Sequence, residues 1–251
     1  MQQQPQTPAL KGRFTSARIV RRLDLTSDLW RIWLSPAEPF PFKAGQYCTI
    51  GTGGIERPYS IASPPAEPEL ELFIEHIPVP VGQLTPLLYK LQVGDQVTLR
   101  PRAKGLFVFN EGYRNHLMVS TVTGVAPFVS MLRAQLARPR PADRFFVLEG
   151  ASYHDEFGYD AELREMAAAH PKRVVFIPSV SRPQDPRNSG WKGATGRINT
   201  LVEGYLKDLA LPPAETCVYL CGHPLMIEDV KRRLDGSGYH IEEERFWKEE
   251  E

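Results

Sequence analysis

The sequence has few cysteines, no long apolar run and no excess of charge of either sign. Its 251 residues include three cysteines, Cys48, Cys217 and Cys221, too few for a disulfide scaffold or for an internal iron–sulfur cluster held by four thiolates. Lys and Arg total 30 and Asp and Glu total 30, so the surplus of cations typical of proteins that coat nucleic acid is absent. No apolar stretch approaches the ~20 residues of a membrane-spanning helix, and residues 1–10 lack the apolar core of a signal peptide. We therefore expect a cytoplasmic protein with no nucleic-acid partner and no integral membrane segment.

Proline is abundant in contrast, with 23 residues, which is about twice the usual ~5% and is typical of chains with many strand ends and turns. In the first half the apolar residues alternate or form short runs that are separated by turn signals. These runs predict strands at residues 15–20, 29–34, 46–50, 70–74 and 96–99, with one helix near residues 84–91. Short strands at this spacing indicate an antiparallel β-barrel or β-sandwich.

From residue 116 onward the pattern changes to strands that alternate with helices. Strands are predicted at residues 117–120, 145–148, 174–177 and 218–221, and helices at residues 127–136, 161–169, 198–209 and 225–234. This alternation predicts a parallel, Rossmann-like α/β sheet with helices on both faces. We place the boundary between two domains near residue 112. Ligands are then expected beyond the carboxyl ends of the strands, at residues 120–127, 179–183 and 221–226.

Two segments of the first half have residue types suited to a flat, phosphorylated ligand. Arg57-Pro58-Tyr59-Ser60 places a cation and an aromatic ring on one face of a strand, where they could hold a pyrophosphate and stack on a planar ring. The alternative is a strand-end arginine with a core tyrosine. In residues 82–85, Thr85 is expected to be the N-cap of the helix, whose free N–H groups would attract phosphate. The alternative is simply a capped helix.

The strand ends of the second half carry further candidates. Residues 122–127 are small, so a ligand could approach the backbone closely, although no G-x-G-x-x-G motif occurs in the chain. Ser181, Arg182 and Arg197 could hold a 2′-phosphate, or they belong to a solvated loop. Cys221 ends a strand; burial in the core is the commoner role of a lone cysteine, and a zinc site lacks other ligands. Aromatic residues at 246 and 247 would pack on a flat cofactor or in an apolar groove.

In their order and spacing, these segments resemble the ferredoxin–NADP⁺ reductase family, especially its bacterial members linked to flavodoxin or ferredoxin. The resemblance extends from residue 13 to residue 247. Residues 57–60 resemble the R-x-Y-S flavin motif, 82–85 the G-x-x-[ST] turn, and 221–226 the C-G-x-P-x-M segment. Residues 122–127 are similar to the G-T-G-x-x-P loop, with Val122 where the family usually has Gly. Residues 244–247 are similar to the bacterial C-terminal aromatic extension.

The resemblance implies two cofactors, FAD bound mainly by residues 1–112 and NADP(H) bound by residues 113–251. It implies that FAD contacts Arg57, Pro58, Tyr59, Ser60, Glu75, His76, Ile77, Gly82, Gln83, Leu84, Thr85, Thr123, Phe246 and Trp247. It implies that NADP(H) contacts Thr123, Gly124, Ser181, Arg182, Arg197, Cys221, Gly222 and Met226. The implied catalytic residues are Ser60, near the flavin N5, Cys221, in the nicotinamide pocket, Phe246, over the isoalloxazine, and Glu244, in proton transfer. Trp247 would stack on adenine.

The activity that follows from this resemblance is hydride transfer between NADP(H) and FAD, and single-electron transfer between FAD and ferredoxin or flavodoxin, by a monomer. Cations outnumber acids between residues 11 and 31, and Arg100, Arg102 and Lys104 follow in the same half. These cations could steer an acidic redox partner, or they could simply solvate strand faces. Two other functions stay open. One is a reductase of free flavin, quinone or an oxygenase, and the other is an FAD-binding electron-transfer subunit of a larger complex.

Overall fold

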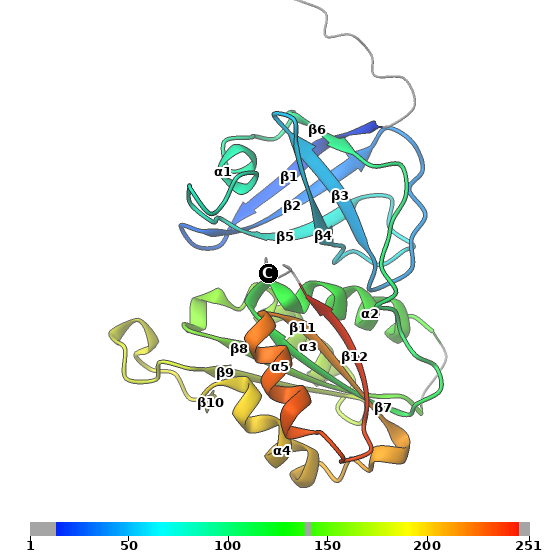
Figure 1. Ribbon diagram of the computed structural model, residues 1–251, viewed down its shortest axis with the longest axis vertical. Helices are drawn as coiled ribbons and strands as arrows, with labels where there is room; N and C mark the ends of the chain where they lie inside the picture. Colours follow the sequence, from blue (N-terminus) through cyan, green and yellow to red (C-terminus); the bar gives the residue numbers. More distant parts are fainter. Residues whose placement is uncertain (1–13, 139–141, 246–251) are drawn as a thin grey trace, which may run out of the picture.

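The first half of the chain forms an antiparallel, nearly closed barrel in the computed structural model, which describes residues 14–138 and 142–245 (Figure 1). Its strands lie in the order β4-β3-β6-β1-β2-β5. A bridge between Ile61 and Leu72 joins the two edges. The elements are β1 (Thr15–Asp24), β2 (Leu29–Pro36), β3 (Tyr47–Thr52), β4 (Ile55–Ser60), β5 (Leu70–Glu75), α1 (Thr85–Leu88) and β6 (Gln96–Leu99).

The second half forms a parallel sheet in the order β10-β9-β8-β7-β11-β12, which confirms the predicted fold class. Its strands are β7 (Asn115–Thr121), β8 (Arg144–Ala151), β9 (Val174–Val180), β10 (Ala194–Thr195), β11 (Thr216–Gly222) and β12 (His240–Arg245). Its α-helices are α2 (Ala126–Leu136), α3 (Asp160–Ala169), α4 (Ile198–Asp208) and α5 (Pro224–Arg233). Short 3₁₀ turns are η1 (Val122–Val125), η2 (His154–Glu156), η3 (Pro186–Asn188) and η4 (Pro213–Glu215).

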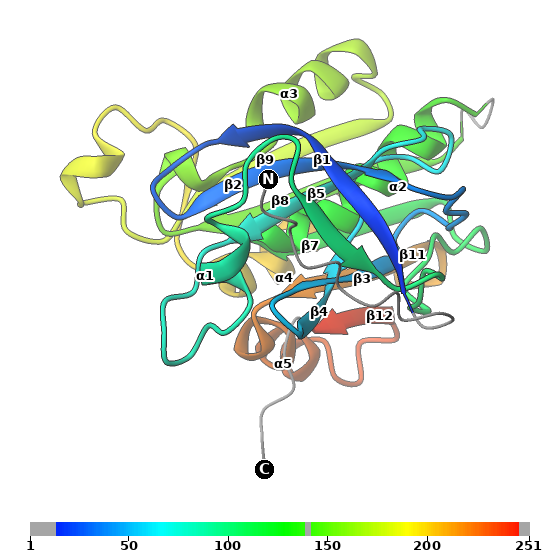
Figure 2. The same cartoon turned by 90° about the horizontal axis from the view of Figure 1, so that it is seen from above.

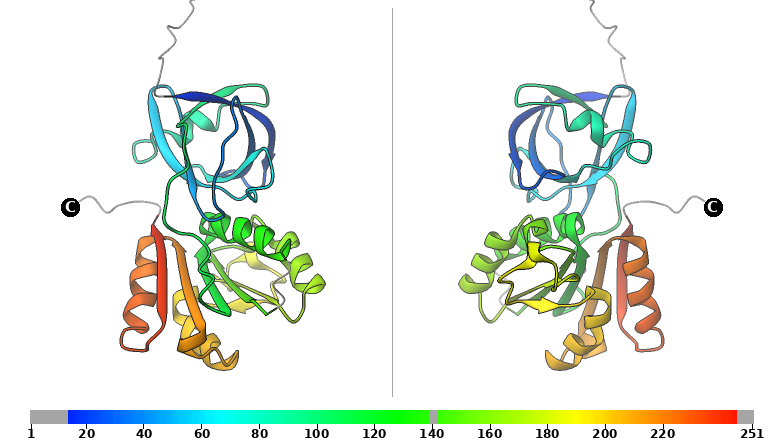
Figure 3. Two further views of the ribbon diagram at one scale, coloured as in Figure 1. Left: turned by 90° about the vertical axis from the view of Figure 1, so that its right-hand side faces the viewer. Right: turned by 90° about the vertical axis from the view of Figure 1, so that its left-hand side faces the viewer.

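Helices cover both faces of the parallel sheet. Apolar residues of α2 and α3 pack on the face toward the barrel, and those of α4 and α5 pack on the opposite face. Figure 3 shows α2 lying directly beneath the barrel, with α5 and β12 at one side. The sheet order places a switch point between β7 and β11, because the chain runs outward from β7 first through β8 and later through β11. Ligands of open α/β sheets bind at such a point, beyond the carboxyl ends of the strands.

A shared core and a buried ion network join the barrel to the parallel sheet. Seen from above, the barrel lies in front of the parallel sheet and the two overlap (Figure 2). Glu71 of β5 is 1% exposed. Its carboxylate accepts hydrogen bonds from Arg133 of α2 at 2.6 Å and from the Tyr159 hydroxyl at 3.0 Å. It also pairs with Arg31 of β2 at 2.9 Å. The far side of Arg133 holds Glu162 of α3 at 2.7 Å. Because three of these residues belong to the second half and contact Glu71 or Arg133, the network fixes the relative position of the two sheets.

Within the described ranges, the helices are all too short or too polar to cross a lipid bilayer.

Candidate active site

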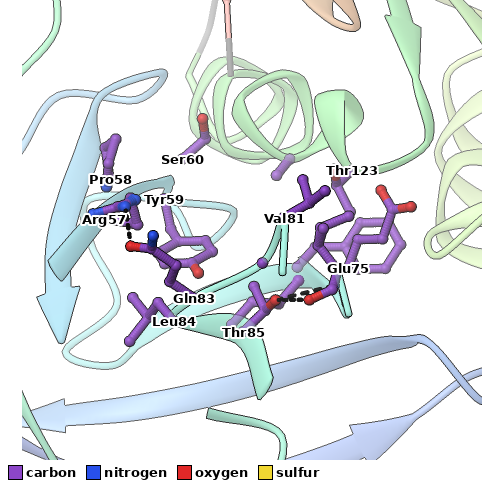
Figure 4. Close-up of a pocket in the computed structure, with 15 residues that line it drawn as sticks. Arg57, Pro58, Tyr59, Ser60, Glu75, Val81, Gln83, Leu84, Thr85 and Thr123 are labelled. Carbon is purple, nitrogen blue, oxygen red and sulfur yellow. Dashed lines mark hydrogen bonds between the residues drawn. The ribbon is translucent and has the colours of Figure 1, made fainter. Parts of the chain in front are cut away.

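A pocket opens on the side of the barrel that faces the parallel sheet (Figure 4). Its walls come from β4, β5, the loop before α1, and the start of α2. The lining residues are Arg57, Pro58, Tyr59, Ser60, Phe73, Ile74, Glu75, Ile77, Val81, Gly82, Gln83, Leu84, Thr85, Thr123 and Ala126. The structure therefore brings together the residues predicted to contact FAD in the described part of the chain, except His76. The ring of His76 lies against Tyr89 instead, with ring centroids 4.9 Å apart.

The loop between β5 and α1 is held in one shape by its own side chains. Thr85 Oγ1 donates to the Ile77 carbonyl at 3.1 Å and accepts from the Ile77 N–H at 3.0 Å. The prediction that Thr85 is the N-cap of α1 is therefore wrong. Leu84 is the N-cap residue and makes no side-chain capping hydrogen bond, and the Thr85 hydroxyl is hydrogen-bonded to Ile77 instead. A Cβ at Gly82 would lie 1.7 Å from the Ile77 carbonyl oxygen, so only glycine fits there. The Gln83 side-chain oxygen Oε1 accepts a hydrogen bond of 3.2 Å from Arg57 Nη2 (Figure 4).

The electrostatics of this pocket favour an anion beside an aromatic surface. Arg57 is exposed, and among the described residues no carboxylate lies within ion-pair distance of it; its guanidinium donates to the Glu56 carbonyl and to Gln83. Burial raises the pKa of the half-buried Tyr59 phenol, while the charge of Arg57 opposes that shift. Tyr59 therefore stays neutral at physiological pH. Burial also raises the pKa of Glu75, and the charges of Asp28 and Glu156 add to the rise.

The end of the pocket near the parallel sheet joins two predicted catalytic residues. Ser60 Oγ donates a hydrogen bond of 3.2 Å to Glu244 Oε2, which links β4 to β12. Burial raises the pKa of Glu244 to about 7, although the hydrogen bond from Ser60 lowers it. A carboxyl group with this pKa can gain or lose a proton near neutral pH, as general acid–base catalysis requires.

Cys221 lies next to Glu244, because the two residues pair across β11 and β12. Cys221 is fully buried. Its pKa is raised well above the usual value, first by burial and then by the charge of Glu244. It is therefore a neutral thiol, not a nucleophile. Gly124 of η1 packs tightly against it, since a Cβ at Gly124 would lie 2.4 Å from the Cys221 carbonyl oxygen.

The cations predicted to hold a 2′-phosphate lie at the carboxyl end of β9 and at the start of α4. Ser181 follows β9 directly, and its N–H donates to the Ala151 carbonyl at 2.9 Å. Arg182 is exposed and donates to the Tyr153 hydroxyl at 2.8 Å. Arg197, also exposed, is the N-cap residue of α4. The exposed side chains of Arg182 and Arg197 can therefore contact an anion near the end of β9, which is separated from the Cys221 strand, β11, by β8 and β7.

Tyr153 and Asn188 also shape this region, although the sequence predicted no role for either residue. Tyr153 contacts Arg182 and also lies under the Arg187 guanidinium, 4.2 Å from its ring centroid. Arg187 pairs with Asp155 at 2.8 Å. The long loop at residues 183–193 is anchored by the buried Asn188, whose amide donates to the carbonyls of Ser152 and Arg182 at 2.9 Å. Tyr153 lies two residues beyond the end of β8, where a ligand of a parallel sheet is expected, and this position could have identified it from the sequence.

The remaining predicted residues are Met226, Gly222, Phe246 and Trp247. Met226 is 5% exposed and packs in the core on the α4 and α5 face, with Ile227 and Val230. Gly222 adopts φ of +125° at the end of β11, where a Cβ would lie 2.3 Å from Thr121 Oγ1. Phe246 and Trp247 lie outside the described residues.

Residues 118–232 match the family model of the oxidoreductase NAD-binding domain. The chain is 31% identical to a ferredoxin–NADP reductase of Pseudomonas aeruginosa, in an alignment that covers 80% of this chain and 81% of that protein. It is 30% identical to the ferredoxin–NAD(P)⁺ reductase component of the naphthalene 1,2-dioxygenase system of Pseudomonas putida, over 88% of this chain and 66% of that protein. A crystal structure of a ferredoxin NADP⁺ reductase from Neisseria gonorrhoeae with bound FAD and NADP is similar with a TM-score of 0.79 at 26% identity, covering 94% of this chain and 100% of that chain.

Proposed function

Because the chain belongs to the ferredoxin–NADP reductase family, we propose that it is an FAD-dependent oxidoreductase that exchanges a hydride with NADP(H) and single electrons with a ferredoxin or flavodoxin. The observation that carries this proposal is the Ser60–Glu244 hydrogen bond beside Cys221, at the end of a pocket lined by Tyr59 and Arg57. It puts a titratable carboxyl group, a hydroxyl and a flat aromatic wall at the junction of the barrel and the switch point of the parallel sheet.

The pocket fits FAD on two observations of the chain itself. Arg57 is an exposed cation without a carboxylate partner in the described ranges, and the turn at Gly82 has no room for a side chain. In this proposal Arg57 holds the diphosphate, Tyr59 packs on the isoalloxazine, and residues 82–85 complete the phosphate-side wall. When bound, FAD supplies the conversion between two-electron and one-electron transfer, and the protein supplies its position and surroundings.

Glu244 is the proton-exchanging group of this proposal. Electron transfer from NADPH to one-electron acceptors releases a proton overall, so a base near the reacting ring is required. With a pKa of about 7, Glu244 is present in both protonation states at neutral pH. The Ser60 hydroxyl, which faces both the pocket and Glu244, links the carboxylate to the ligand.

NADP(H) is proposed to lie across the carboxyl ends of the parallel strands. Ser181, Arg182 and Arg197 would hold the 2′-phosphate near β9, and the nicotinamide would reach Cys221 at the end of β11. The strand order β9-β8-β7-β11 means that a dinucleotide bound at both places must cross the ends of β8 and β7.

Fewer cations of the barrel are free to bind an acidic electron-transfer protein than the number of Lys and Arg residues in this half suggests. Three cations of the barrel are already neutralised by carboxylates, namely Arg22, Arg31 and Arg100. Arg102 and Lys104 are exposed and lie in the segment that leads to Gly105, where a Cβ would be 3.2 Å from Glu244 Oε1. These two cations would therefore attract an acidic partner close to the redox site.

A second candidate function is the reductase component of an oxygenase. The observation that favours it is the 30% identity with the naphthalene dioxygenase reductase component, of which this chain spans 66%. With three cysteines the chain cannot supply four thiolates for a cluster of its own. In either function, then, these 251 residues do not supply the thiolates of an iron–sulfur cluster.

Steady-state assays of NADPH oxidation with ferredoxin, flavodoxin and free FMN as acceptors separate these functions. Our proposal predicts that a protein acceptor gives the highest kcat/KM. A strong preference for free FMN, with no turnover of either protein acceptor, would make the chain a free-flavin reductase. Turnover only with an oxygenase-type ferredoxin would favour the second candidate.

A further inference from the structure

The backbone at Val122 adopts an unusual conformation at the switch point of the parallel sheet. Its φ is +43°, in the left-handed region that β-branched residues avoid because their Cβ crowds the backbone. Among the described residues, Ala210 is the other non-glycine residue with positive φ, and it lies just beyond α4. Val122 therefore holds a strained conformation in the loop that follows β7.

Two sets of contacts hold this strained loop in place. On one side, Thr121 Oγ1 accepts a hydrogen bond of 2.9 Å from the His223 N–H, and Gly124 packs against the Cys221 carbonyl. On the other side, the Val122 side chain packs in an apolar cluster whose other members are Ala151, Phe157, Val180 and Trp191. Ala151 ends β8 and Val180 ends β9. The half-buried Val122 side chain also packs against the main core cluster, so it lies beside the ends of both strands.

This placement puts Val122 between the two ends of the proposed nucleotide site. Val180 immediately precedes Ser181 and Arg182, the proposed 2′-phosphate ligands. Thr123, on the other side of Val122, lines the pocket that holds Tyr59 and Ser60. Resting on the proposed function, we propose that Val122 is an affinity-determining residue for the pyridine dinucleotide, and that its side chain weakens binding of the part of the ligand that crosses β8 and β7.

The proposal distinguishes the whole dinucleotide from its adenosine end. NADP⁺ must cross the ends of β8 and β7 to reach Cys221, whereas 2′,5′-ADP needs only the cations near β9. Removal of the Val122 side chain should therefore strengthen binding of NADP⁺ and leave 2′,5′-ADP unaffected. We expect the Kd of NADP⁺ to fall about tenfold in Val122→Gly, because the side chain that stands beside the path of the ligand is removed. Val122→Ala, which removes bulk but keeps a Cβ at positive φ, should show a smaller fall.

Calorimetric titration of the flavin-containing full-length protein with each ligand tests this inference. An unchanged Kd for NADP⁺ in both variants overturns it, as does an equal gain for 2′,5′-ADP, which would mean that the variants alter the adenosine end. If the unmodified protein binds neither ligand, the proposed function itself fails, and the two failures are thereby distinguished.

Unfolding measurements test the strain without any ligand. Glycine normally destabilises a protein relative to alanine, but at positive φ this order reverses. Val122→Gly should therefore be at least as stable as Val122→Ala. Val125 is the matched control, because it is buried in the same turn with φ of −71°. Val125→Gly should be less stable than Val125→Ala. The same order at both positions would show that Val122 is not strained.

Discussion

Ser60 and Glu244 are 184 positions apart in the chain, yet the serine hydroxyl donates a hydrogen bond of 3.2 Å to the glutamate carboxylate. The contact joins the last residue of β4 to the edge strand β12 of the other sheet. It therefore exists only when the barrel and the parallel sheet are correctly placed against each other. The environment of the proposed proton-exchanging group, Glu244, therefore forms only when both domains are folded and packed together.

Replacing Glu244 with glutamine should slow NADPH oxidation and remove its pH dependence near neutrality. The ionised carboxylate is the form that accepts a proton, so the rate of the unmodified enzyme should rise with pH through about 7, the pKa of Glu244. Glu244→Gln cannot titrate, and its rate should be lower by roughly 10²-fold and flat across this range. Steady-state kcat from pH 5.5 to 8.5 measures both effects. A retained inflection near pH 7 would assign the titration to another group.

Ser60→Ala should move the same inflection upward. The hydrogen bond from Ser60 stabilises the ionised carboxylate and lowers the pKa of Glu244. Without that bond, Glu244 holds its proton to higher pH. The pH profile of kcat at saturating NADPH measures the shift, which a merely structural serine would not produce. A downward shift would show that the bond favours the protonated form.

Arg182→Ala should raise the KM for NADPH about tenfold or more, since a charge-assisted contact contributes ~1.5–3 kcal/mol, while the KM for NADH changes little. The reason is that only NADPH presents a 2′-phosphate to the exposed guanidinium at the end of β9. Arg232→Ala is the matched control, because Arg232 is an exposed arginine of α5 paired with Asp229. Equal increases for both nucleotides would exclude Arg182 as the 2′-phosphate ligand.

Glu71→Gln should lower the free energy of unfolding by ~3 kcal/mol or more, because it leaves the largely buried Arg31 without its carboxylate and leaves Arg133 with the carboxylate of Glu162 alone. Chemical denaturation measures the loss. Glu38→Gln, at an exposed carboxyl on the barrel surface, should change stability little. If the loss at Glu71 is under about 1 kcal/mol, the network is no stronger than an exposed ion pair.

Glu149→Gln should become more stable relative to the unmodified protein as the pH rises. Glu149 is 0% exposed and neither carboxylate oxygen has a hydrogen-bond partner in the described structure. Burial, reinforced by the charge of Asp160, raises the pKa of Glu149 well above its usual value. Above the ordinary pKa of about 4.3 the unfolded chain releases this proton while the folded chain retains it, so folding stability falls by ~1.4 kcal/mol per pH unit. This loss continues until the pH reaches the raised pKa.

Denaturation curves at pH 5, 6.5 and 8 test that sign. The difference in unfolding free energy between Glu149→Gln and the unmodified protein should grow across the series. Glu165→Gln, at an exposed position on α3, is the control and should show no such trend. A difference that is constant with pH would mean that Glu149 is ionised in the folded protein.

The sequence predicted the elements that have strong apolar patterns. The runs at Leu117–Ser120 and Phe145–Leu148 are bounded by turns and became the centre of the parallel sheet. β12 was not predicted, because its sequence HIEEER has one aliphatic residue and lies at an edge of the sheet. Helix α1 is shorter than predicted and spans Thr85–Leu88.

The site was predictable where it lies within one segment and not where it depends on tertiary placement. The run from Arg57 to Ser60 could be recognised locally, and these residues do line one pocket. The positive φ of Val122 and the pairing of Glu71 with Arg133 arise from the packing of distant segments. Thr85 shows the same limit. The sequence predicts that it caps the helix, but in the fold its hydroxyl is hydrogen-bonded to the backbone of Ile77.

The most direct test of the central claim is the anaerobic absorption spectrum of the purified protein during titration with NADPH and with NADH. The account predicts flavin absorbance in the protein as purified and bleaching by NADPH at a much higher rate than by equal NADH. Arg182→Ala should reduce that preference. A protein that shows no flavin absorbance after reconstitution with FAD, or whose bound flavin is not reduced by either nucleotide, would contradict the account.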